Sequence, residues 1–589
     1  EPELTRYLRA VAGITLLENE SNLGFVATVN RGMALHPARD VVLLNSDTVV
    51  ANDWLDRLRE CAWRDRATAS VTPFSNNATI CSYPRFCQDN ALPDGESVAA
   101  LDALFRDVNR GEAVPIPTAV GFCMYIRRDC LEQVGPFDVA LFGRGYGEEN
   151  EFCLRAARHG WQHLLCADTF VYHAGGVSFA DTQSEQQKSA MQTLTALYPD
   201  YEALIQKFVA SDPVAPYRFA ADVERARRAG RPAVLMVNHA RGGGTERHLG
   251  ELADAAAVHA TVLILRPHGL ENQAAMLSLH GSGNGVPFDP IADYELLLDL
   301  LRVAGVSRVH FHHTIGVHMQ FWRLPQDLGV PYDFTVHDYY LACPQVTMTA
   351  PDGTYCGEPD DEGCRRCLQK RPAPGTGSIR EWRQAGDAII HGADRVFVPG
   401  RDAEQRIQRY FPGAATVLAP HENSRLRAAP VRAAPLADEE PLRIAVIGAI
   451  GVFKGANLLE ACALDARRRR LPLEYHLLGY AYRRLSGWPA STLREHGPYR
   501  EEDLAQLLGE LAPHVVWFPG SCPETYSYTL SACITLGLPV VATAIGAFGE
   551  RLAGREWSWL VEPDPAPAAM SDLFVSLRGN FLRGEAPEP

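Results

Sequence analysis

Three short apolar runs, each closed by a polar or glycine-rich turn, constrain the fold of this chain most strongly. They are Val41–Leu44 before Asn45-Ser46-Asp47, Ala233–Val237 before Asn238–Thr245, and Leu442–Ile447 before Gly448–Gly455. Apolar residues that follow one another without alternation indicate strands buried on both faces, as in a parallel sheet. A glycine-rich turn into a helix is a common connection in such sheets. The sequence therefore predicts an α/β protein.

Length and composition limit the class of protein. A chain of 589 residues is too long for one core, so two to four domains are expected. Hydrophobic residues make up 46% and charged residues 22%, as in ordinary globular proteins. The net charge of −15 argues against general nucleic-acid binding. No apolar run approaches a membrane span and no signal peptide is visible, so we expect a cytoplasmic protein whose 14 cysteines are mostly reduced thiols.

Composition changes along the chain predict its division into domains. The first domain should cover residues 1–208 and a proline-containing linker 209–230, with two further domains at 231–430 and 431–589. Gly13–Leu17 is predicted to be a strand. The run at Val41 already looks like a middle element of a fold, so we expect part of the first domain to precede residue 1.

A glycine-rich turn leads into an acidic helix start at Leu141–Phe152. Three alternating glycines precede Glu148 and Glu149. Glycines permit unusual backbone angles and close approach of a ligand, and the helix dipole keeps carboxylates in a first turn ionised. Such a carboxylate can act as a general base when a hydroxyl comes within hydrogen-bonding reach. The ordinary alternative is a solvent-exposed acidic helix start.

Polar residues also end two predicted strands of the first domain. Asp47 follows Val41–Leu44, at the position where ligands bind in open α/β sheets, and its carboxylate suits Mg²⁺ or Mn²⁺. An N-cap for the helix at Trp54–Arg59 is the alternative role. His173 closes another strand, where a single histidine is more often structural than a ligand.

Taken in order, the motifs of residues 13–180 resemble a family-2 glycosyltransferase of the GT-A fold. They are Asn22–Phe25, Leu43–Asp47, Gly135–Asp138, Gly145–Glu151, Arg155 and Val171–His173. The resemblance implies a nucleotide-sugar donor and inversion at the anomeric carbon. It makes Asp47 and His173 metal ligands and Glu149 the catalytic base. Asn22, Gly24 and Asn45 are expected beside the donor, with Asn45 standing where the family has the first aspartate of its metal motif.

The region after Ala233 contains histidines and cysteines that could bind a metal. His310, His312, His313 and His318 invite a metal interpretation. Alternation along a strand puts His310 and His312 on one face and His313 on the other, so we favour structural roles. Cys343, Cys356, Cys364 and Cys367 lie in a polar segment predicted to be irregular, where four thiols suit a structural Zn²⁺. Two disulfides or free thiols are the alternatives.

Residues 231–565 resemble a family-4 glycosyltransferase of the GT-B fold, with two facing Rossmann-like domains. The motifs are Gly242–Glu246, His337-Asp338, Lys454-Gly455, Pro523-Glu524 and Gly537–Val541. The resemblance implies retention of configuration without a metal. It places donor-binding roles on Gly243, Gly244, Lys454, Ser527, Tyr528 and Thr529, and catalytic roles on Glu524 and His337. The family's second glutamate is replaced by Ala532, which weakens the expected grip on the ribose.

Together these patterns predict a GT-A-like module that lacks its first strand unit, fused to a GT-B module. The expected function is bifunctional transfer of sugars from nucleotide-sugar donors to a growing surface glycan of the O-antigen type. The acceptor could be lipid-linked, with peripheral membrane contact. Two alternatives stay open: one module alone is catalytic while the other binds glycan, or the acceptor is a protein.

Overall fold

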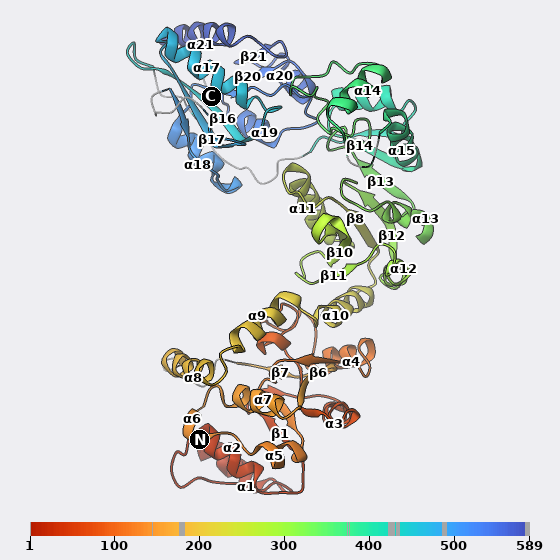
Figure 1. Ribbon diagram of the computed structural model, residues 1–589, viewed down its shortest axis with the longest axis vertical. Coiled ribbons are helices and arrows are strands. Elements are labelled where there is room, and N and C mark those ends of the chain that lie inside the picture. The colour runs from red at the N-terminus through yellow and green to blue at the C-terminus, as the bar shows by residue number, and fades with distance from the viewer. Residues whose placement is uncertain are drawn as a thin grey trace.

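The computed structural model describes residues 2–143, 145–175, 183–373, 375, 377–421, 430–431, 436–485 and 492–583. Three α/β units follow one another along the long axis of the molecule (Figure 1). The expectation of a mixed α/β protein with a GT-A-like first domain and Rossmann-like parallel sheets is confirmed. None of the described helices is both long and apolar enough to cross a membrane.

The first unit is built on a mixed sheet with the strand order β1-β5-β3-β6-β4. Its strands are β1 (Val41–Leu44), β3 (Thr68–Phe74), β4 (Ala113–Ile116), β5 (Cys123–Ile126) and β6 (Gln162–Phe170). Its helices are α1 (Pro2–Ala10), α2 (Phe25–Met33), α3 (Trp54–Arg64), α4 (Val98–Val108), α5 (Arg128–Val134), α6 (Val139–Phe142), α7 (Glu148–Arg158), α8 (Gln183–Leu197) and α9 (Tyr201–Ser211).

Two predictions for this unit are wrong. Strand β1 pairs antiparallel with β5 at the edge of the described sheet, and Leu44 is 43% exposed, so β1 is not a buried parallel strand. Gly13–Leu17 forms no strand and is largely exposed, because no described strand lies beside it to accept its hydrogen bonds.

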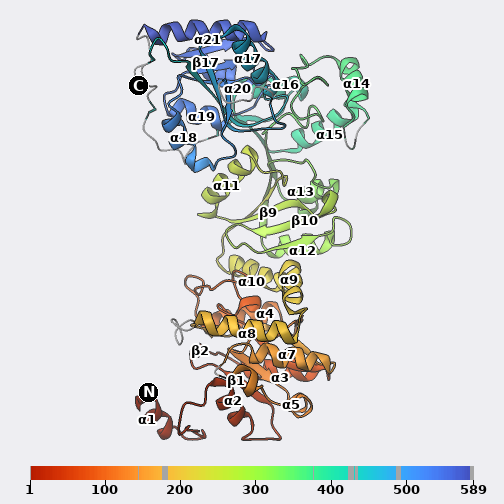
Figure 2. The same ribbon diagram turned by 60° about the vertical axis from the view of Figure 1, so that its left-hand side comes forward.

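The predicted linker 209–230 is largely a packed helix, α10 (Ala215–Arg228), between the first and middle units (Figure 2). Asp222 of α10 is buried and accepts hydrogen bonds from Tyr83 of the first unit (2.9 Å) and from Asn284 of the middle unit (2.8 Å). Proline starts this helix instead of breaking it, since Pro216 lies in the first turn. The connection is therefore an ordered junction that both units contact.

The middle unit carries an eight-stranded sheet in the order β11-β10-β9-β8-β12-β13-β14-β15, parallel except at β10 and β11. The strands are β8 (Ala233–Val237), β9 (Thr261–His268), β10 (Ala274–Leu279), β11 (Gly285–Phe288), β12 (Val306–Phe311), β13 (Tyr332–Thr335), β14 (Arg395–Val398) and β15 (Thr416–Leu418). The helices are α11 (Gly244–Ala257), α12 (Tyr294–Val303), α13 (Leu324–Leu328), α14 (Asp361–Lys370), α15 (Ile379–Gly392) and α16 (Arg401–Tyr410).

The C-terminal unit has a parallel sheet in the order β18-β17-β16-β19-β20-β21. Numbered within this unit, the order is 3-2-1-4-5-6, which is that of the Rossmann fold. The strands are β16 (Leu442–Ile450), β17 (Leu473–Ala481), β18 (Leu493–Glu495), β19 (Val515–Phe518), β20 (Val540–Thr543) and β21 (Ser558–Val561). The helices are α17 (Ala456–Arg469), α18 (Leu504–Leu511), α19 (Tyr528–Thr535), α20 (Gly546–Leu552) and α21 (Pro567–Leu582).

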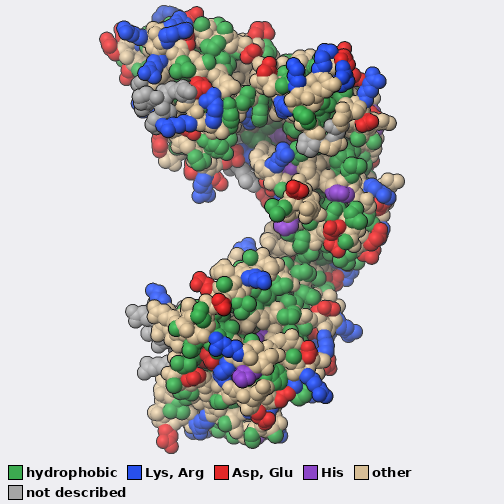
Figure 3. Space-filling model, viewed as in Figure 1, with side chains coloured by type: hydrophobic (Ala, Val, Ile, Leu, Met, Phe, Trp, Pro, Cys, Tyr) green, Lys and Arg blue, Asp and Glu red, His purple; other side chains and the backbone are tan. Residues whose placement is uncertain are grey.

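The middle and C-terminal units face each other across a hollow that the space-filling view shows (Figure 3). Contacts close this hollow on one side. The Glu550 carboxylate of α20 accepts hydrogen bonds from the backbone N–H groups of Arg401 (2.9 Å) and Asp402 (3.0 Å) at the start of α16. Since an anion is favourable at a helix N-terminus, this contact holds the two units together.

Candidate functional site

A short antiparallel ribbon brings Asp47 and His173 together in the first unit. Strand β2 (Thr48–Val49) pairs with β7 (Tyr172–His173), and the Nε2 atom of His173 lies 3.5 Å from Oδ2 of Asp47. The Nδ1 atom of His173 lies 2.8 Å from the backbone oxygen of Asn77. A carbonyl oxygen only accepts, so Nδ1 carries the proton and Nε2 presents its lone pair toward Asp47. These two side chains are arranged to hold a divalent cation.

Glu148 and Glu149 begin α7 with their side chains turned inward. Each has one buried carboxylate oxygen without a hydrogen-bond partner. Burial is the main cause that raises the pKa of Glu148 to about 8, and burial also raises the pKa of Glu149. Glu151, three residues after Glu148 on the same helix, instead forms a salt bridge with Arg155, with 2.9 Å between Oε2 and Nη2. Burial thus outweighs the helix dipole, which was expected to keep these carboxylates ionised. A carboxylate whose pKa is raised is a stronger base than an ordinary glutamate, which suits proton transfer near neutral pH.

The loop Gly121–Phe122 connects the acidic pair to the Asp47–His173 pair. A Cβ atom at Gly121 would lie 3.7 Å from the Glu149 side chain, and the Phe122 ring stacks on His173 with ring centroids 5.1 Å apart. The backbone N–H of Asn45 donates to the Phe122 oxygen at 2.9 Å. Gly121 of this loop thus lies beside the expected base, Glu149, and Phe122 contacts the expected metal ligand His173.

The turn that contains Asn22 and Gly24 starts α2. The Asn22 side chain accepts a hydrogen bond from the Gly24 N–H at 2.9 Å, and Gly24 has φ = 78°, a backbone angle that glycine adopts without strain. Asn22 is exposed and Gly24 is half-buried. A Cβ atom at Gly145 would lie 3.5 Å from Phe25, so this turn lies beside the glycine-rich segment before α7.

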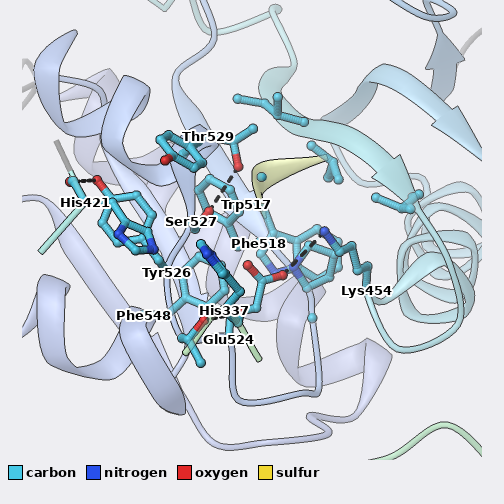
Figure 4. Close-up of a pocket in the computed structure, with 18 of the residues that line it drawn as sticks. His337, His421, Lys454, Trp517, Phe518, Glu524, Tyr526, Ser527, Thr529 and Phe548 are labelled. Carbon is cyan, nitrogen blue, oxygen red and sulfur yellow. Dashed lines mark hydrogen bonds and ion pairs between the residues drawn. The ribbon is translucent and has the colours of Figure 1, made fainter. Parts of the chain in front are cut away.

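A second candidate site is a cavity of about 310 Å³ between the middle and C-terminal units (Figure 4). Lys454, after β16, and Glu524, after the neighbouring strand β19, meet there with Nζ and Oε1 3.6 Å apart. The charge of Glu524 is the main cause that raises the pKa of Lys454. A cation and a carboxylate therefore lie together at the carboxyl edge of a parallel sheet, where such folds bind ligands.

Helix α19 starts at the same cavity. The hydroxyl oxygen of Ser527 caps it by accepting a hydrogen bond from the Leu530 N–H at 3.2 Å, and it lies 3.1 Å from the hydroxyl of Thr529. From the middle unit, Gly244 at the start of α11 faces α19, since a Cβ atom there would lie 3.4 Å from the Tyr528 ring. Gly243 precedes it with φ = 79° and does not line the cavity. The amides at the start of α19 offer a site for an anion.

Imidazoles gather on the middle-unit side of the cleft. Nitrogen atoms of His248, His312 and His337 all lie within 4.8 Å of one another, and the His421 ring lies 3.9 Å from that of His248. Burial is the main cause that lowers the pKa of His248 to about 4 and of His421 to about 3, and it lowers those of the other two well below the usual value. These imidazoles are therefore neutral at neutral pH.

The structure assigns the histidines of strand β12 to different roles. His310 lies 2.7 Å from the Thr335 hydroxyl and His313 lies 2.8 Å from Asp338, as expected of structural residues. His312 instead joins His337. Sequence reasoning did not single out His248 or His421. The position of His248, one turn into the helix after the glycine-rich loop, could have indicated that it faces the cleft.

The segment with four cysteines is not wholly irregular, because Cys364 and Cys367 lie on α14. All four thiols are free, and the charges of neighbouring thiols contribute to raising the pKa values of Cys343 and Cys356. Among the residues that the structure describes, no three of these thiols approach within 4.8 Å. The structure therefore shows neighbouring cysteines but no formed tetrahedral site.

Residues 6–192 match the family described as "Glycosyltransferase like family 2". This match confirms the predicted class of enzyme, a glycosyltransferase. A search of curated proteins gives no match.

Solved structures of glycosyl-transferring proteins are similar at a low level. HepE of Anabaena in complex with UDP and glucose has 11% identity and a TM-score of 0.39, covering 60% of this chain and 94% of that chain. Sucrose-phosphate synthase from Thermosynechococcus elongatus has 16% identity and a TM-score of 0.39, with the same coverage. The pneumococcal O-GlcNAc transferase GtfA in complex with UDP and GlcNAc has 7% identity and a TM-score of 0.38, covering 60% and 93%. Likeness of this size decides neither substrate nor mechanism for this chain.

Proposed function

We propose that this glycosyltransferase uses two sites, each of which transfers a sugar from a nucleotide-sugar donor to a growing surface glycan. The observation that carries the proposal is that each half brings together a carboxylate and groups that can compensate the negative charge of a diphosphate, either directly or through a bound cation. In the first unit these are Glu149 and the Asp47–His173 pair. In the cleft they are Glu524 and Lys454.

In the first unit, Glu149 would remove the proton from an acceptor hydroxyl as the sugar–phosphate bond breaks and the new glycosidic bond forms. Attack from the face opposite the leaving group inverts the anomeric carbon. Asp47 and His173 would hold Mg²⁺ or Mn²⁺, and their fit is supported by the free lone pair of His173 Nε2 beside the Asp47 carboxylate. The ion supplies charge neutralisation for the departing diphosphate.

In the cleft, Lys454 and the first amides of α19 would bind the donor diphosphate, with Ser527, Tyr528 and Thr529 forming the helix start. Glu524 and His337, which line the same cavity, would contact the transferred sugar. We propose retention of configuration for this half, on family likeness alone. A lipid-linked acceptor, a cytoplasmic location with peripheral membrane contact, and a zinc ion on the cysteine segment are further parts of the proposal.

Separate variants test the assignment of two sites. Glu149→Gln and Glu524→Gln are assayed with a panel of nucleotide sugars, and the release of nucleoside diphosphate and the linkage formed are measured. Two sites are supported if each variant loses one linkage and keeps the other. If neither variant changes transfer, both assignments fail. Metal analysis of Cys364→Ser tests the zinc proposal, which fails if the zinc content is unchanged.

One observation favours a second candidate, in which only the first unit is catalytic. Ala532 is 3% exposed and packs in the apolar cluster beneath α19, so no carboxylate stands where family-4 enzymes grip the ribose. The cleft would then bind glycan or nucleotide without transfer. Under this candidate Glu524→Gln leaves every linkage unchanged, whereas Glu149→Gln abolishes all transfer.

A further inference from the structure

Three histidines meet at the floor of the cleft, from elements that are distant in sequence. His312 and His337 follow the neighbouring parallel strands β12 and β13, and His248 lies one turn into α11. The Nδ1 atom of His312 lies 3.2 Å from Nε2 of His337, and the ligating nitrogens of all three residues lie within 4.8 Å of one another. The fold therefore brings these three rings to one point.

Protein contacts do not account for all of this cluster. His310 and His313, on either side of His312 in the sequence, each have a polar partner in Thr335 and Asp338. The Nε2 atom of His312 is buried and has no hydrogen-bond partner. An unpaired buried polar atom is costly, so hydrogen bonds within the protein explain the flanking histidines and Nδ1 of His312 but leave Nε2 of His312 unexplained.

The spacing fits a tetrahedral metal site. Zinc binds histidine nitrogen at about 2.0–2.1 Å, so two nitrogens of a tetrahedral site lie about 3.3 Å apart. The separation of 3.2 Å between Nδ1 of His312 and Nε2 of His337 matches this value, and it equally matches a hydrogen bond between the two imidazoles. His248 would complete the set by a movement of its side chain. Its ring lies 3.9 Å from that of the buried His421, at an angle of 33°.

The chemistry of the ligands selects the class of metal. Imidazole nitrogen suits Zn²⁺ and similar transition metals, whereas Mg²⁺, Mn²⁺ and Ca²⁺ prefer oxygen ligands. Among the described residues, this group of three contains no carboxylate. Three protein ligands leave a fourth position for water or a substrate oxygen. His337 lines the cavity that also contains Lys454 and Glu524, so the open position would face that cavity.

We propose that His248, His312 and His337 bind one Zn²⁺-class cation whose open position faces the cleft between the two units. Binding of the ion does not depend on the proposed function. Its further role, which is to hold a hydroxyl or phosphate oxygen of a substrate, rests on the cleft being a transfer site. The site is separate from the Asp47–His173 pair, which lies in the first unit and contains an oxygen ligand.

Binding of Co²⁺ to the metal-free full chain tests the site directly. Co²⁺ bound by nitrogen and oxygen absorbs in the visible range without the near-ultraviolet charge-transfer bands of thiolate ligands, so the cysteine segment is distinguished in the same spectrum. In an excess of Mg²⁺, which competes for the Asp47–His173 pair, we expect one Co²⁺ per chain with the nitrogen-type spectrum. We expect this signal to be lost in His312→Gln and its affinity to fall at least tenfold in His248→Gln.

The matched control is His280→Gln, which removes a histidine that is paired with Asp254 at 2.9 Å outside the cluster. Its Co²⁺ spectrum should equal that of the wild-type protein. Far-ultraviolet circular dichroism and melting curves of all variants identify a folding defect. If His312→Gln does not fold, the variant at the partly buried His248 still tests whether the cluster binds Co²⁺. The inference is overturned if the wild-type protein gives only a thiolate-type spectrum, or if both cluster variants bind Co²⁺ as the wild type does.

The same measurements separate this inference from the proposed function. Nitrogen-type Co²⁺ binding in a protein that transfers no sugar at the cleft keeps the metal site and removes the second transfer site. Sugar transfer at the cleft without nitrogen-type Co²⁺ binding keeps the second transfer site and removes the metal site.

Discussion

The site in the first unit gathers carboxylates, whereas the cleft between the other two units gathers imidazoles and a lysine. In the first unit, Asp47, Glu148 and Glu149 surround the region below the Gly121–Phe122 loop. In the cleft, Lys454 and the start of α19 supply positive charge. A diphosphate would thus need a metal ion in the first unit, while in the cleft Lys454 and the amides of α19 supply compensating charge beside any ion that the proposed histidine site holds.

The two sheets explain this difference. The carboxyl ends of parallel strands and the helices that follow them present backbone N–H groups to a ligand, as the order of β16–β21 allows. The first unit instead has a mixed sheet, and Asp47 and His173 meet on a separate two-stranded ribbon. The two sites would therefore compensate the charge of a donor diphosphate with different groups, and the following variants distinguish them.

The largest expected effect is that of Glu149→Gln. Because a general base contributes roughly 10²–10⁴-fold to a rate, the linkage formed by the first unit should fall by about that factor while the cleft keeps its activity. Release of nucleoside diphosphate is measured with each accepted donor. Glu202→Gln, an exposed change on α9, is the control. Full activity of the first unit in Glu149→Gln would show that another group takes the proton.

Asp47→Asn should lower transfer by the first unit about 100-fold and weaken its response to Mg²⁺ or Mn²⁺, because the charged oxygen ligand is lost. Transfer at the cleft should not change. Rates are measured over a range of metal concentrations, with the exposed Asp56→Asn variant as the control. A metal response equal to that of the wild type would remove Asp47 from the metal site.

Sequence reasoning predicted these elements unevenly. The strand Ala233–Val237 has the expected bounds, since its unbroken apolar run suits a strand with a parallel neighbour, β9 or β12, on each side. The pairing of β1 depends on β5, about 80 residues away, and a run of four apolar residues cannot show whether its partner is parallel. Only the second half of α10, from Asp222 to Arg228, was predicted as helix, because the proline near its start reads as a break.

The candidate sites show the same limit. Asp47 and His173 could be named because each lies at a strand end, and Lys454 and Glu524 because they lie in motifs that resemble those of family-4 enzymes. The structure brings each pair together. The grouping of His248 with His312 and His337 could not, since it depends on how α11 packs over two strands that follow it in the chain. Proximity of this kind is created by packing between elements and has no local pattern.

Glu148→Gln should change how stability depends on pH. In the folded protein the pKa of Glu148 is about 8, above the value of 4.5 of an ordinary glutamate, so the folded state holds a proton that the unfolded state has released. Stability is therefore lost as the pH rises from about 5 to 8. The variant lacks this loss and should be more stable than the wild type above pH 8, by on the order of 2 kcal/mol, and no different at pH 5.

Melting curves of the first transition between pH 5 and pH 9 measure this effect. Glu202→Gln, which removes an exposed carboxylate from the same unit, should follow the wild-type curve at every pH. If Glu148→Gln runs parallel to the wild type, Glu148 does not hold a proton in the folded protein above pH 5, and the contrast between an acidic first site and a positively charged cleft is weakened.

The smallest expected effect is that of Lys454→Ala on binding of a nucleoside diphosphate. Lys454 is a point charge 3.6 Å from Glu524, and the amides of α19 remain in the variant to bind the phosphates. Affinity should therefore fall only about tenfold, equal to about 1.4 kcal/mol. Calorimetry measures it, with Lys370→Ala, an exposed change on α14, as the control. A Lys454→Ala variant that binds as tightly as the wild type would mean that α19 alone neutralises the diphosphate, so that the cleft differs from the first unit by its helix and not by its lysine.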